Sequence, residues 1–153
     1  MNRRLTFLAW FVQVLAISGT AFFAYAKGVF QTVYADDASM MTSVIAVLFV
    51  GAAAWLGRQA WRADDDPVVE CPGVVVPYAD ADFGHLAERL CVMAGFVGTA
   101  IGLSMQAKAL AGGATSFTAL ATSLFTTSSG GTAAALIAVM TYSLEAGIRR
   151  ARR

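Results

Sequence analysis

The segment TSLFTTSSGGT, residues 122–132, carries seven hydroxyl side chains within a long stretch that has no charge. A hydroxyl group both donates and accepts hydrogen bonds, so hydroxyls can relay a proton or hold a carboxylate. Lipid hydrocarbon offers them no partner. Each Ser or Thr can also bond a carbonyl oxygen one turn earlier in its own helix, which lowers its cost there. The hydroxyls are therefore candidates for an ion pathway, and bonding to their own backbone is the alternative.

A second stretch, LCVMAGFVGTAIGLSMQA, places small and polar residues at helical spacing. At about 100° per residue, Gly95, Thr99, Gly102 and Gln106 fall on one stripe, with Gly98 beside it. Small residues let helix backbones approach closely in lipid. The stripe is interpreted either as a helix-packing seam or as a polar lining that faces a pore or a guest helix.

The composition of the chain indicates that these stretches lie in a membrane. The 153 residues are 58% hydrophobic and 14% charged, whereas a soluble domain has about 25% charged residues. Long charge-free runs alternate with short charged segments, and a helix needs about 20 apolar residues to cross the hydrocarbon core. We therefore expect an all-α integral membrane protein, with residues 1–153 forming a single membrane domain. Its four expected transmembrane helices cover about 5–26, 40–56, 84–107 and 117–148, with a loop at about 57–83.

The basic residues predict the orientation of the four helices. Nine arginines fall on one side of the expected membrane, and Lys27 and Lys108 fall on the other. Because cytoplasmic segments carry an excess of Lys and Arg, both termini and the loop 57–83 are expected in the cytoplasm. The start MNRR and the triplet AYA at 24–26 resemble a signal peptide. The apolar stretch between them is longer than the usual core of about 7–15 residues, so a retained helix is expected.

Other kinds of site have weak support in the sequence. Cys71, Cys91 and His85 lack the tight ligand spacing of metal centres, so neither a metal nor a cofactor is expected. The triplet DDD at 64–66 is interpreted as a solvated loop, with cation binding as the alternative. No nucleophile–base set or phosphate-binding loop is evident, so we expect that the protein is not an enzyme.

Two motifs carry a resemblance to a known family. AGFVGTAIGLSMQ contains Gly95, Gly98, Thr99 and Gly102, and ALATSLFTTSSGGTAAALIAVMTYSLE contains Thr127 followed three residues later by Gly130. In their order and spacing these stretches resemble the last two membrane helices of the MotA/TolQ/ExbB proton-channel family. The resemblance covers roughly 60 residues, about 90–149.

The resemblance implies a fold, an activity and partners. Members of that family form a homo-oligomeric ring, typically a pentamer, in the bacterial inner (cytoplasmic) membrane. The ring surrounds single-span partners, MotB/TolR/ExbD-like, that carry a membrane Asp. Protons or sodium ions pass between ring and partner and drive energy transduction. The expectation for this chain is a ring subunit of an ion-motive-force-driven motor in contact with itself, such a partner and membrane lipid, with no nucleic acid.

The resemblance and the spacing together give the candidate site residues. The paired threonines that face the partner in the family would be Thr99 and Thr127. Residues expected in the pore or ion pathway are Thr99, Thr122, Thr126, Thr127 and Ser129. Residues expected in helix packing are Gly95, Gly98, Gly102, Gly130 and Gly131.

The chain departs from the family in two respects. Some members carry Glu where this chain has Thr122, and here residues 90–107 and 117–144 hold no Asp, Glu, His, Lys or Arg. The loop 57–83 is also shorter than the cytoplasmic domain of its relatives. Two alternatives stay open, a stand-alone oligomeric ion channel and a holin-like structural membrane protein. A neighbouring gene for a single-span protein with a membrane Asp would favour the motor.

Overall fold

The computed structural model describes residues 5–28, 31, 40–65, 81–112 and 117–151. Its helices are α1 (Leu5–Ala26), α3 (Met41–Asp65), α4 (Asp82–Ala111) and α5 (Phe117–Ala151), and the described residues contain no strand. All four helices are long and apolar enough to cross a membrane, as judged by length and composition. The expectation of four long apolar helices is therefore confirmed, and the fold has the character of a multi-pass membrane protein.

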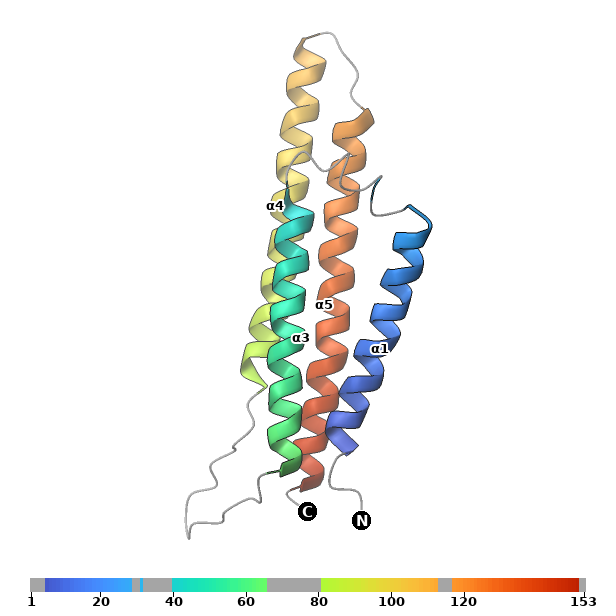
Figure 1. The fold of residues 1–153 in the computed structure, drawn as a ribbon. Helices are drawn as coiled ribbons and strands as arrows, with labels where there is room; N and C mark the ends of the chain where they lie inside the picture. Colours follow the sequence, from blue (N-terminus) through green and yellow to red (C-terminus); the bar gives the residue numbers. More distant parts are fainter. Residues whose placement is uncertain (1–4, 29–30, 32–39, 66–80, 113–116, 152–153) are drawn as a thin grey trace.

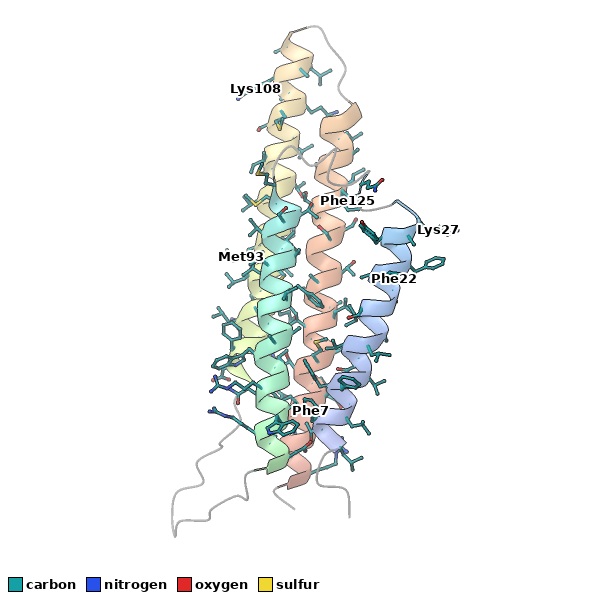
Figure 2. The ribbon with its side chains drawn as sticks, viewed as in Figure 1. Phe7, Phe22, Lys27, Met93, Lys108 and Phe125 are labelled. Atoms are coloured by element: carbon teal, nitrogen blue, oxygen red, sulfur yellow. The ribbon has the colours of Figure 1, made fainter. Side chains whose placement is uncertain are left out.

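The helices run alternately up and down, and the start of α1 and the end of α5 lie at the same end of the bundle, which we call the base (Figure 1). The helix α5 packs against α1, α3 and α4, and α1 lies at the edge of the bundle against α3 and α5. At the opposite, outer end, α4 and α5 extend past the ends of α1 and α3 (Figure 1). Lys27 and Lys108 mark the outer ends of α1 and α4 (Figure 2).

The helix α3 is longer than the sequence predicted. It continues to Asp65, so the part of the expected loop from 57 to 65 is helical. The segment GRQAWRADD contains no proline to break the helix. It also continues the buried face of α3, because Gln59 and Ala60 are buried. The first proline is Pro67, which lies with the rest of 66–80 outside the described residues. At the other boundary α4 begins at Asp82, after the N-cap residue Ala81, which makes no side-chain capping bond.

The buried core lies nearer the base and is formed by α3, α4 and α5. Its largest fully buried side chains are Leu56, Cys91, Thr126, Ile137 and Thr141. Large apolar side chains such as Phe22, Val47 and Phe96 are instead exposed on the outside of the bundle. Such a surface is expected for a protein whose solvent is lipid, because hydrocarbon accepts apolar groups at no cost.

The carboxylate of Asp64 holds the first turn of α1 against the base of α3. Its Oδ2 accepts a hydrogen bond of 2.8 Å from the Phe7 backbone N–H, and its Oδ1 accepts one of 3.4 Å from the Thr6 N–H. The first N–H groups of a helix have no partner within that helix, and a negative charge is favourable at this end. Asp64 thus caps α1 from another helix. The rings of Phe7 and Trp61 meet edge to face at 4.9 Å beside this contact (Figure 2 labels Phe7).

Two further polar contacts attach the lower half of α1. The Trp10 indole N–H donates to the Ala53 carbonyl oxygen at 3.1 Å, and the Gln13 amide donates to the Ser143 hydroxyl at 2.8 Å. Trp10 also lies against Gly57, where a Cβ atom would overlap the indole ring. The position of α1 therefore depends on contacts near the base.

We predict that Asp64→Ala loosens α1. Loss of an N-cap acceptor costs about 1 kcal/mol, so the thermal unfolding midpoint of the purified protein in mild detergent should fall. Asp64→Asn keeps one acceptor oxygen and should lie between the variant and the parent. Equal midpoints for Asp64→Ala and the parent would contradict the capping role.

Candidate functional site

Two glycines allow α4 and α5 to approach until their backbones touch. A Cβ atom built on Gly130 would lie 2.7 Å from the Cys91 carbonyl oxygen and 2.9 Å from the Gly95 Cα. A Cβ atom on Gly95 would lie 3.3 Å from the Gly130 Cα. Carbon atoms of neighbouring residues do not pack at such distances, so only glycine fits at Gly130. The α4–α5 seam is thus a small-residue contact of the kind that joins helices in lipid.

The other expected packing residues divide into two groups. Gly98 receives the buried side chain of Thr126, since a Cβ on Gly98 would lie 2.7 Å from the Thr126 Cβ. Gly102 is buried in α4 as well. Gly131 is exposed, and a Cβ there would meet no described atom within 4 Å. Within the subunit, therefore, Gly131 does not belong to the α4–α5 contact, because it faces away from α4.

The seam brings the hydroxyls of Thr99 and Thr127 into contact. The two Oγ1 atoms are hydrogen-bonded to each other. The Ser123 carbonyl oxygen accepts a hydrogen bond from the Thr127 hydroxyl at 2.9 Å and lies 3.3 Å from the Thr99 hydroxyl. The Thr99 hydroxyl also lies 2.9 Å from the Gly95 carbonyl oxygen. Thr99 is half-buried and Thr127 is exposed. This hydroxyl pair, Thr99 and Thr127, therefore joins two helices and reaches the surface of the subunit.

Four other hydroxyls in this stretch of α5 bond to their own helix. Ser123, Thr126, Ser128 and Ser129 each donate to a carbonyl oxygen three or four residues earlier, at 2.8 to 3.1 Å. Such bonds satisfy a hydroxyl within the helix, so these four do not require a polar environment. Thr126 is fully buried in the seam, which is a packing position. The side chain of Thr122 lies outside the described part of the chain.

A second polar cluster lies at the base of the same two helices, and the sequence analysis did not identify it. The His85 Nε2 lies 2.9 Å from the Glu145 Oε1, and Arg149 donates to the Glu145 Oε2 at 2.9 Å. The His85 Nδ1 faces the Glu88 Oε2 at 3.8 Å. The spacing of Glu145 and Arg149, one helical turn apart, was visible in the sequence, but the partner of Glu145 on α4 depends on how the helices align.

The candidate metal residues from the sequence do not share one location in the described structure. Cys91 is buried in the core, while the His85 imidazole contacts Glu145. Cys71 and the third aspartate of DDD lie outside the described residues, and Asp64, the first, caps α1.

We predict that Gly130→Ala separates α4 from α5, because its methyl group would overlap the α4 backbone. Overpacking of this kind costs about 1–3 kcal/mol and should lower the thermal unfolding midpoint in detergent. Gly131→Ala is the matched control, since its methyl group meets open space in the subunit. If the two variants unfolded at the same temperature, the close contact at Gly130 would be refuted.

Comparisons of the chain with protein-family models, with curated proteins and with solved structures found no match in any of the three. Its function is accordingly inferred from the hydroxyl pair and from the helices that hold it.

Proposed function

We propose that this chain is the ring subunit of an ion-motive-force-driven membrane motor or energy transducer. In this proposal protons, or sodium ions, pass at the interface between the ring and a single-span partner that carries a membrane Asp. The ring, of five subunits by resemblance, lies in the bacterial inner membrane with both termini in the cytoplasm. The observation that carries the proposal is the contact between Thr99 and Thr127, whose hydroxyls meet at the surface of the α4–α5 hairpin.

The chemistry of the hydroxyl pair suits contact with a carboxylate. Residues 90–107 and 117–144 contain no Asp, Glu, His, Lys or Arg, so a titrating group at this level has to come from another chain. An ionisable group within a membrane is costly and needs a polar neighbour. Thr127 is exposed and can donate or accept, and Thr99 fixes its position. A partner carboxylate could hydrogen-bond to the hydroxyl pair, with apolar side chains around it.

The arrangement of the helices favours a ring with α4 and α5 innermost. The outer part of the α4–α5 hairpin extends beyond α1 and α3 and is not covered by them (Figure 1). The exposed large side chains along the hairpin include Phe96, Leu103, Leu124 and Phe125. In the proposed ring, neighbouring subunits and the partner cover this part, while α1 lies toward lipid.

We predict that Thr127→Val leaves the ring assembled but lowers ion flux. Valine keeps the shape of threonine and removes the hydroxyl, and loss of one hydrogen bond of about 1 kcal/mol corresponds to about fivefold in rate. Flux is measured in vesicles that contain the complex isolated from its native membranes, under an imposed proton or sodium gradient.

Three control variants separate the relay from a general effect. Thr127→Ser keeps the hydroxyl and should retain flux, and Ser128→Ala removes a hydroxyl that bonds only its own helix. Thr141→Val changes a threonine far from the pair and should also retain flux. Unchanged flux in Thr127→Val would refute the relay role of Thr127.

The same measurement tests the two alternative functions. Flux through the purified chain without any partner would favour a stand-alone channel, and no gradient-dependent flux at all would favour a structural, holin-like protein.

We predict the membrane orientation from the excess of arginine at the base. In a variant that lacks the native cysteines, Ala111→Cys at the outer end of α4 should react with a membrane-impermeant thiol reagent in intact cells. Ala63→Cys near the base of α3 should react only after the membrane is opened. The reverse labelling pattern would overturn the orientation.

A further inference from the structure

The base of the α4–α5 hairpin carries the single histidine of the chain, set between two carboxylates. The His85 Nε2 contacts the Glu145 Oε1 at 2.9 Å, and the Nδ1 faces the Glu88 Oε2 at 3.8 Å. The imidazole side chain is half exposed, at 50%, so water reaches it. An imidazole can hold a proton on either nitrogen and exchanges it readily near neutral pH. His85 therefore has a carboxylate at each of its two proton-binding atoms.

The two carboxylates differ in their other contacts. Arg149 donates to the second carboxylate oxygen of Glu145, so that carboxylate is shared between the His85 imidazole and the Arg149 guanidinium. Glu88 lies on the same helix as His85, and the described structure pairs it with His85 alone. Glu145 thus contacts the imidazole at Nε2, and Glu88 lies near its Nδ1.

Among the described residues, the ion pairs of this imidazole are those with Glu88 and Glu145. The other charged groups of α4 near the base are Asp82 and Arg89, and no ion pair between either and His85 is described. On α3, Arg58 and Arg62 are exposed, and Asp64 is engaged with the first turn of α1. The imidazole is therefore controlled by Glu88, Glu145 and Arg149.

A buried hydroxyl lies one turn from Glu145, on the core side of the cluster. Thr141 is fully buried, and its Oγ1 has no hydrogen-bond partner among the described residues. It contacts Gly84, the residue before His85, where any Cβ atom would overlap the hydroxyl. A buried hydroxyl without a partner is costly. The contacts of His85 with Glu145 and Glu88 do not involve Thr141.

We propose that His85 is the proton-transfer site at the base of each subunit, which exchanges protons between the ion pathway and the cytoplasm. This inference rests on the proposed function. The Nδ1 lone pair accepts a proton from a water-borne hydronium ion while Nε2–H remains bonded to Glu145. The imidazolium then releases the Nδ1 proton to the Glu88 carboxylate, and the Glu88 carboxylic acid passes it on to water, so both side chains return to their starting states.

In this proposal the hydroxyl pair and the His85 imidazole are two successive sites on the proton pathway. Thr99 lies 14 residues after His85 on α4, which is about 21 Å along the helix. The core between them is filled by Cys91 and Ile137, both fully buried. In this proposal the core is therefore not the route, and groups of the partner or water at the ring–partner interface carry protons over this interval.

The test measures the pH dependence of proton flux in His85→Gln. Glutamine can still donate a hydrogen bond to Glu145 but cannot take up a proton. Flux should fall about tenfold or more at a base-side pH of about 8, where hydronium is scarce, and should approach the parent value near pH 6. Arg89→Gln, a change one turn away on the same helix, is the matched control and should keep the parent profile. Ring assembly of each variant is checked by native mass.

A second measurement reads the imidazole directly. Because the chain has one histidine, its ring carbon signal in the magnetic resonance spectrum of the labelled complex is unambiguous. The signal should differ between acidic and alkaline pH if the imidazole takes up and releases a proton. A signal that is the same at acidic and at alkaline pH would overturn the proposal.

The outcomes separate this inference from the proposed function. Proton flux in the parent with an unchanged profile in His85→Gln would refute the role of His85 and leave the motor intact. Flux carried by sodium alone would also refute it. No gradient-dependent flux in the parent would refute the motor and, with it, the role of His85.

Discussion

The backbone contact between Gly95 and Gly130 sets the positions of the polar groups that α4 and α5 share. Once two antiparallel helices touch at one point, each step toward the base on α4 is matched by a step toward the base on α5. The contact therefore fixes the alignment of the whole hairpin. The pairs that follow from it are Gly98 with Thr126, Thr99 with Thr127, Gly84 with Thr141, and His85 with Glu145. A side chain at Gly130 would disturb every one of them.

The hydroxyl-rich stretch of α5 has a simpler explanation than its composition suggests. Most of its hydroxyls bond carbonyl oxygens of the preceding turn, and in this state they carry little unsatisfied polarity into the membrane. The number of hydroxyls alone therefore does not require polar surroundings. Thr127 differs because its hydroxyl also meets a hydroxyl of another helix and is exposed. The distinction between an ion pathway and a tolerated polar helix thus depends on one pair.

The sequence predicted the helices better than their ends and better than the contacts between them. Charge-free length alone indicated four apolar helices. The end of α3 was misplaced because charged residues were taken as its limit, whereas Arg58, Arg62 and Asp64 continue the helix past the apolar run. The pairing of Thr99 with Thr127 was expected from a family resemblance, and the resemblance itself stays a prediction. The contact of His85 with Glu145 was not expected, since it depends on an alignment that single-helix periodicity does not reveal.

The cap that Asp64 provides has a consequence for how the chain is made. The helix α1 is synthesised first, but the carboxylate that binds its Phe7 amide lies 57 residues further along. Until α3 has been synthesised as far as its last turn, the start of α1 must leave its backbone donors to water or to lipid headgroups. The N-terminal helix is thus an early product whose docking is a late event. Ribosome-bound chains that end before Asp64 lack this cap, and chains that end before Ser143 also lack the partner of Gln13, so α1 docks in steps as the chain lengthens.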